Sequence, residues 1–319
     1  MRSTRRLALG ASLLASLAIA GTAGGGAIVS AQDQPTVRIG SDGFYESQLL
    51  AEIYAQALEA EGFGVERQLA IGARPARVEA FESGQIDLVP EYVGSGLGFY
   101  TVGAEDPELA AIEVTGDGET NRANLQSALD IAAVEATVLA ITTGEDTNAA
   151  VVRPDTAEQF GLATISDLAA VADQVSFGLP PECEVNALCR GALEDGYGIA
   201  WPPAQLELLP PCGAEMAGAL EGNAIDVAWL CSTQPVIAQN GWVVLEDDLD
   251  TQPAENLAPV VRNDFLESVE GGADTIAAIL DPVSAAITTE VLTELGVRVA
   301  VDQESIADVA AEFLASLDD

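Results

Sequence analysis

The chain contains no histidine and no lysine among its 319 residues. Histidine is the commonest general base and metal ligand near neutral pH, so its absence removes the usual mechanisms of hydrolases and the usual zinc sites. The basic side chains are 12 arginines against 51 acidic residues, which gives a formal net charge of −39. Because a surface of this sign repels nucleic acid and anionic lipid headgroups, we expect neither as a partner.

Long apolar runs are also scarce. The run from Leu7 to Ala20 is only 14 residues long, whereas a membrane span needs roughly 20. Three arginines precede it, and small residues ending at Ala31 follow it. This order predicts a signal peptide over residues 1–31, cleaved after Ala31, in an exported protein that works in the periplasm or outside the cell. Loss of the three arginines takes the net charge from −39 to −42.

Cysteine occurs only four times, and no pair has the C-x-x-C spacing of redox and zinc sites. In an exported protein an even number of cysteines predicts disulfides rather than a metal site. Four cysteines allow three pairings. We favour Cys183 with Cys189 and Cys212 with Cys231, because both bridges are then local in the sequence.

The mature sequence alternates apolar strands with amphipathic helices. Strands are predicted over 36–40, 65–69 and 86–89, and helices over 46–61 and 76–83. This β-α-β-α-β order predicts an α/β fold whose parallel strands are joined by right-handed connections and covered by helices on both faces. The length of the chain allows a second lobe with its own core.

The stretch from Gly84 to Gly98 combines a buried strand with a glycine-rich segment. Pro90 ends the apolar part, and Glu91 and Tyr92 follow directly. Gly94, Ser95 and Gly96 then suit either a turn with open backbone amides or the start of a helix. We expect this stretch to present a ligand-binding surface at the carboxyl edge of the sheet, with an ordinary strand-to-helix loop as the alternative.

Three segments carry a resemblance to a known family. They read V-R-I-G-S-D-G-F-Y-E-S-Q-L-L, A-F-E-S-G-Q-I-D-L-V-P-E-Y-V-G-S and E-D-D-L-D-T-Q-P-A-E-N-L-A-P-V-V. They resemble the substrate-binding proteins of osmoprotectant ABC importers, which bind glycine betaine, choline and carnitine. The resemblance implies the two-lobed α/β fold of type II periplasmic binding proteins, with two crossing strands, the ligand between the lobes, and no chemistry on it. Lobe 1 is expected over residues 32–142 and 258–319, and lobe 2 over residues 143–257.

The resemblance also implies a cage of aromatic rings that holds a trimethylammonium group by cation–π attraction. Tyr92 keeps the cage position in the motif E-Y-x-G-[ST]. The other three positions carry Ala149, Cys231 and Glu255, none of which has a ring. A basic residue that often follows the first strand in the family is replaced by Asp42.

Two explanations of the depleted cage stay open. Other rings can replace it, with Asp42 or Glu255 offering a carboxylate to the cation. Alternatively, the ligand is a different polar solute held by hydroxyl and amide groups. The replacement rings considered are Phe44, Tyr45, Tyr197 and Trp201. The candidate ligand-binding residues are Ser41, Asp42, Phe44, Tyr92, Gly94, Ser95, Thr147, Asn148, Ser232, Thr233 and Glu255.

Three further side chains are weighed against plainer roles. Arg74 and Arg190 are possible partners for a ligand carboxylate, although a helix-surface arginine is more often a solvated charge. Trp229 lies inside an apolar strand and is expected to belong to the core.

The sequence therefore predicts a monomeric solute-binding protein that delivers a small compatible solute to an ABC permease in the membrane. No catalytic residue, cofactor or metal is expected. The alternative from a different class is an exported hydrolase that uses paired carboxylates. Its signal is nearly empty, because 51 acidic residues allow almost any carboxylate pair.

Overall fold

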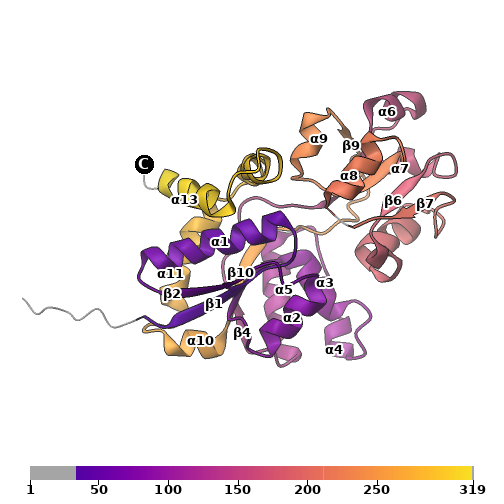
Figure 1. Cartoon of the computed structure of the whole chain (residues 1–319). Coiled ribbons are helices and arrows are strands. Elements are labelled where there is room, and N and C mark those ends of the chain that lie inside the picture. Colours follow the sequence, from indigo (N-terminus) through magenta and orange to yellow (C-terminus); the bar gives the residue numbers. More distant parts are fainter. Residues whose placement is uncertain (1–33, 211, 318–319) are drawn as a thin grey trace, which may run out of the picture. The chain divides into compact units, whose positions relative to one another are not determined.

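The computed structural model describes residues 34–210 and 212–317 (Figure 1). The predicted signal peptide lies outside these residues. A first sheet has the strand order β2-β1-β3-β10-β4, and β1 pairs in parallel with β2 and β3, as the sequence predicts. Strand β10 returns late in the chain and pairs antiparallel with β3 and β4. The strands are β1 (Thr36–Gly40), β2 (Gly64–Gln68), β3 (Leu88–Tyr92), β4 (Ala136–Val138) and β10 (Leu257–Arg262).

Helices cover both faces of this sheet (Figure 1). Residues of α1 such as Leu50 and Ile53 are fully buried and pack with α11, α12 and α13 on one face, while α2, α3 and α5 pack on the other. The helices of this half are α1 (Tyr45–Ala60), α2 (Arg74–Glu82), α3 (Val93–Thr101), α4 (Pro107–Ala110), α5 (Gly118–Ile131), α10 (Asn263–Ser268), α11 (Ala273–Ala286), α12 (Thr289–Gly296), η3 (Val297–Val301) and α13 (Ile306–Ser316).

A second sheet has the strand order β7-β6-β8-β5-β9. Strand β8 sends Val227 and Trp229 to one core and Ala228 and Leu230 to the other, because successive side chains of a strand point to opposite faces. Its strands are β5 (Asn148–Val152), β6 (Phe177–Leu179), β7 (Leu206–Leu208), β8 (Val227–Cys231) and β9 (Val243–Val244). Its helices are α6 (Pro154–Phe160), α7 (Ile165–Ala169), η1 (Pro181–Val185), η2 (Ala187–Gly196), α8 (Ala214–Glu221) and α9 (Pro235–Gln239).

Both predicted disulfides are present. Cys183 and Cys189 join η1 to η2, and Cys212 and Cys231 join the segment before α8 to the end of β8. The Cα atoms are 5.1 and 5.2 Å apart, within the usual range for a disulfide. The choice of local pairings is therefore confirmed.

The C-terminal helices differ from expectation at Pro282. The sequence predicts that a helix ends at Asp281, because proline lacks the amide hydrogen that continues a helix. Helix α11 instead runs through Pro282 to Ala286. Leu280 and Val283 are buried against α1 and its neighbours, and this packing outweighs the lost hydrogen bond. In the part of the chain that the structure describes, no single helix has the length and hydropathy of a membrane span; α11 passes only jointly with the following segment, Thr289–Val301, which is bent from it by 81°.

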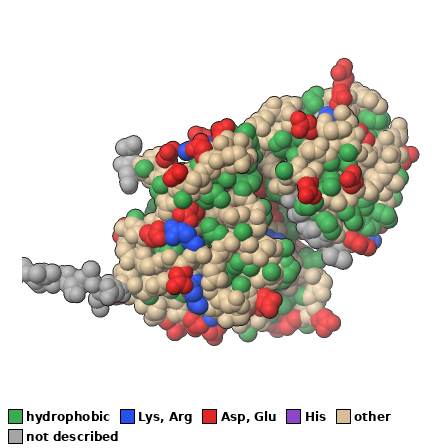
Figure 2. Space-filling view, in the orientation of Figure 1, with side chains coloured by type: hydrophobic (Ala, Val, Ile, Leu, Met, Phe, Trp, Pro, Cys, Tyr) green, Lys and Arg blue, Asp and Glu red, His purple; other side chains and the backbone are tan. Residues whose placement is uncertain are grey.

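The charge excess lies mostly at the surface. All nine arginines of the described residues pair with at least one carboxylate. Figure 2 shows acidic side chains spread over the visible face, with few arginines among them. The positive side chains are thus already occupied, and the remaining acids face water.

Candidate ligand-binding site

A cavity of about 770 Å³ opens where β1, β3 and β8 end. This volume falls within the range of roughly 300–1,000 Å³ that is usual for small-molecule sites. Strands β1 and β3 are parallel, so their carboxyl ends reach the same edge and bring Asp42 and Tyr92 together. The cavity is lined by Asp42, Phe44, Gly72, Ala73, Arg74, Pro75, Tyr92, Ser95, Gly98, Phe99, Val102, Asp146, Asn148, Pro180, Pro181, Asn186, Leu188, Cys189, Pro210, Cys212, Trp229, Cys231 and Glu255.

Four aromatic rings line the cavity: Phe44, Tyr92, Phe99 and Trp229. The centroids of Phe44 and Tyr92 are 6.0 Å apart, with their planes inclined by 39°. Phe44 precedes α1, Phe99 lies in α3, and Trp229 lies in β8. The family cage positions predict only one ring, and the fold supplies three more from other elements.

A buried ion cluster supports one side of the cavity. The Arg77 guanidinium is 3% exposed; its Nε donates to Asp42 at 3.3 Å and its Nη2 to Glu91 at 2.5 Å. Arg74 Nη2 donates to Glu91 at 3.1 Å and to the Ser95 hydroxyl at 2.6 Å. Burial alone would raise the pKa of Glu91, but the two arginines lower it below its ordinary value. Burial raises the pKa of Asp42 despite Arg77.

Glu255 lies on the crossing segment before β10 and is 2% exposed. Its Oε2 accepts the Ser95 amide hydrogen at 3.0 Å, in the first turn of α3, where a carboxylate is favoured by the helix dipole. Burial is the main cause that raises the pKa of Glu255 to about 8, and the backbone hydrogen bond from Ser95 and the charge of Arg74 oppose it. Near neutral pH this carboxyl group is therefore mostly protonated.

A second pair of buried carboxyl groups lies beside Tyr92. Thr233 joins them, because its hydroxyl donates to Glu46 at 2.7 Å and its amide donates to Asp146 at 3.0 Å. The Tyr92 hydroxyl donates to the other oxygen of Glu46 at 2.6 Å, and the Ser232 hydroxyl lies 3.2 Å from Asp146. Burial raises the pKa of Glu46, and the neighbouring Asp146 raises it further. These bonds link the start of α1 to the end of β8.

Six of the eleven predicted ligand-binding residues line the cavity, and five do not. The lining ones are Asp42, Phe44, Tyr92, Ser95, Asn148 and Glu255. The other five have contacts within the fold. Ser41 accepts the Ala70 amide hydrogen, and Gly94 lies so close to the crossing segment that a Cβ would be 2.7 Å from the Ala254 carbonyl. Thr147, Ser232 and Thr233 bond one another, Asp146 or Glu46.

The other candidates divide in the same way. Arg74 lines the cavity, whereas Arg190 pairs with Glu194 and is not among the lining residues. Tyr45, Tyr197 and Trp201, considered as replacement rings, are also not among the lining residues.

Sequence reasoning missed Asp146, Phe99 and the second role of Trp229. Trp229 belongs to the core, as predicted, but it also lines the cavity. No local pattern singles out Phe99, since it is the helical position of α3 that turns it toward the cavity. Asp146 precedes the motif position at Asn148, and an acidic residue beside a motif position was the one signal available.

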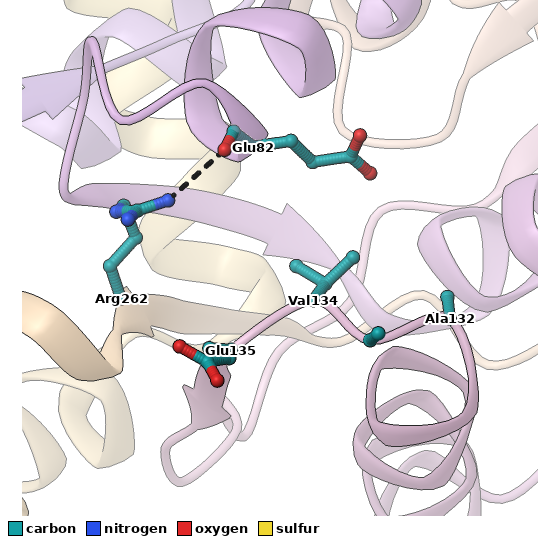
Figure 3. A pocket seen from close by; sticks show the side chains of 6 residues that line it. Glu82, Ala132, Val134, Glu135 and Arg262 are labelled. Atoms are coloured by element: carbon teal, nitrogen blue, oxygen red, sulfur yellow. Dashed lines mark hydrogen bonds between the residues drawn. The ribbon is translucent and has the colours of Figure 1, made fainter.

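A separate hollow of about 240 Å³ lies near the end of α2 and is shown in Figure 3. Arg262 donates there to the backbone carbonyls of Phe81 and Glu82 and pairs with Asp264. Its lining contains no aromatic ring, and its one arginine is already occupied. Within residues 34–210 and 212–317 no group of three or more acidic or cysteine side chains is arranged to hold a metal ion.

Comparison with known proteins points to one kind of binder. The description "substrate binding domain of ABC-type glycine betaine transport system" matches residues 35–316. The glycine betaine-binding protein YehZ of Escherichia coli K12 is 29% identical over 286 residues, covering 87% of this chain and 89% of that protein. A glycine-betaine-binding protein of Pseudomonas aeruginosa is 28% identical, covering 88% and 87%. A crystal structure titled glycine betaine/carnitine/choline ABC transporter has a TM-score of 0.68 at 20% identity, covering 88% and 97%, and shares the fold.

Proposed function

Since the chain belongs to the family of substrate-binding domains of ABC-type glycine betaine transport systems, we propose that it captures a small quaternary ammonium solute in the cavity. Members of this family bind a solute on the outer side of the cytoplasmic membrane for an ABC transporter, and they are not enzymes. Glycine betaine and choline are the ligand types that the relatives' names suggest.

The composition of the cavity carries this proposal. Its four rings can face a trimethylammonium group, each contributing about 0.5–2 kcal/mol by cation–π attraction. Its charged lining consists of Asp42, Asp146 and Glu255 against Arg74 alone, and Arg74 is held by Glu91 and Ser95. A cation is therefore favoured over an anion, and the depleted family cage is replaced by rings from other elements.

The remaining parts of the proposal concern how the protein works. We assign lobe 1 to residues 32–142 and 258–319 and lobe 2 to residues 143–257, in keeping with the strand membership of the two sheets. A solute that touches both lobes shifts them toward a closed form by its differential affinity for that form. The protein acts as a monomer without chemistry on the solute, is exported by its signal peptide, and hands the solute to a permease.

A thermal-shift panel tests the function. We expect glycine betaine, choline or carnitine to raise the melting temperature, because a ligand at 100 times its dissociation constant stabilises a protein by about 2.7 kcal/mol. Amino acids, sugars and ectoine serve as controls, and we expect no shift with them. Shifts with amino acids or sugars alone would overturn the assignment and favour the polar-solute alternative, while turnover of a glycoside panel would indicate the hydrolase.

Substitution of Tyr92 tests the role of the rings. Tyr92→Ala should weaken binding of choline at least tenfold, because it removes a ring that lines the cavity beside Phe44. Tyr92→Phe is the matched control, since it keeps the ring and loses only the hydroxyl bond to Glu46. Isothermal titration of both variants measures the difference. Equal affinities for the two variants would place the cation away from Tyr92.

A further inference from the structure

Three buried polar side-chain atoms lack a hydrogen-bond partner in the part of the chain that the structure describes. They are Arg153 Nε, Trp229 Nε1 and Glu255 Oε1. Arg153 still pairs with Asp226 through another nitrogen, at 3.0 Å. Trp229 and Glu255 both line the cavity, and they come from β8 and from the crossing segment before β10.

Unpartnered buried polar atoms are unfavourable, because each loses its bonds to water without replacement. Trp229 is 3% exposed and Glu255 is 2% exposed, so bulk water does not compensate either atom. The indole Nε1–H can only donate, and a carboxylate oxygen accepts a hydrogen bond or attracts a positive charge. A single ligand that carries both a hydrogen-bond acceptor and a positive charge can satisfy the two atoms together.

We propose that Trp229 and Glu255 form a recognition pair: Glu255 attracts the cationic head of the solute, and the Trp229 indole N–H donates to an acceptor on the solute's short tail. This inference rests on the proposed function and narrows its ligand class. The preferred solutes are quaternary ammonium compounds with a hydroxyl or carboxylate a few bonds from the nitrogen. Cations without an acceptor bind more weakly.

The other donors of the lining are less available for that acceptor. Arg74 uses its Nε and Nη2 on Glu91 and Ser95. Asn148 lies with its amide nitrogen 3.4 Å from Gln252 Oε1. The Ser95 hydroxyl is engaged by Arg74, and the Tyr92 hydroxyl donates to Glu46. The indole of Trp229 is thus the donor whose bond is still to be made.

The first test compares two ligands on the unmodified protein. Propyltrimethylammonium has a methyl group where choline has its hydroxyl, so the pair differs only in the acceptor. We expect titration calorimetry at pH 9 to give choline about three- to tenfold higher affinity, which is the usual worth of one hydrogen bond. Equal affinities would overturn the recognition pair while leaving the proposed function intact. Absence of binding by both compounds and by glycine betaine would instead contradict the proposed function.

The second test substitutes the donor. Trp229→Phe keeps an aromatic ring and removes the N–H, so it should weaken choline about three- to tenfold and leave propyltrimethylammonium unchanged. Trp242→Phe is the matched control, because Trp242 is buried but is not among the lining residues. Glu255→Gln should weaken both compounds to a similar extent. An equal loss of both ligands in Trp229→Phe would mean that Trp229 acts through its ring or its packing, and would reject the pair.

Discussion

Between pH 6 and pH 9 the affinity of the protein for choline should rise about 100-fold, although the charge of choline does not change in this range. The reason is Glu255, whose pKa is raised to about 8 mainly by burial. At pH 6 only about 1% of Glu255 is ionised, and the cation must either bind a neutral carboxyl group or drive its ionisation. Titration calorimetry over this range measures the effect.

The slope of this pH profile identifies the group. Glu255→Gln should have low affinity at both ends of the range and lose most of the slope. The charged groups facing Glu255 are Arg74, which favours its ionisation, and Glu91, which opposes it. Asp42 and Asp146 also line the cavity with a raised pKa, and they leave a smaller slope at lower pH. A slope that persists unchanged in Glu255→Gln would assign the titration to them.

The same group gives a stability effect of opposite sign in the unliganded protein. Its pKa is about 8 in the folded state against an ordinary value of 4.5, so the folded protein binds the extra proton between these values. This contribution to the free energy of unfolding is complete below pH 4.5 and is lost as the pH rises through 8. Denaturant unfolding without ligand should show this decline, and Glu255→Gln should show less of it.

The largest stability loss is expected for Arg77→Leu. Arg77 is 3% exposed and pairs with both Asp42 and Glu91, which are 3% and 4% exposed. Removing one partner of a buried ion cluster leaves carboxylates without compensation and typically costs about 3–5 kcal/mol. Urea unfolding at pH 7 measures the loss. The loss should shrink near pH 4, because the stranded carboxyl groups then become protonated.

A surface pair provides the matched control for Arg77. Arg122 pairs with Glu119 one helical turn away in α5, and the Glu119 side chain is 63% exposed. Arg122→Gln should therefore cost less than about 1 kcal/mol. The double variant Arg77→Leu/Glu91→Gln should recover part of the loss, because one buried charge is then removed. An Arg77→Leu loss no larger than that of Arg122→Gln would show that the cluster is not a stabilising element.

The local features of this protein follow from its sequence. The parallel start of the first sheet, the first long helix and the two local disulfides are encoded by short-range patterns of apolar spacing, turn residues and cysteine separation. Motif positions lead to the sheet edge that carries Asp42 and Tyr92. Even so, Pro282 shows that packing by distant elements can override a local rule.

The composition of the cavity was decided by the tertiary structure alone. Phe44, Phe99 and Trp229 lie far apart in the chain, and only the packing of α1, α3 and β8 brings their rings to one space. Likewise, whether a carboxylate is paired or left unpartnered depends on long-range neighbours. Arg77 holds Asp42 from 35 residues away, and Ser95 holds one oxygen of Glu255 from 160 residues away. Burial and charge pairing are properties of the folded chain, so the sequence could nominate these groups but could not assign their roles.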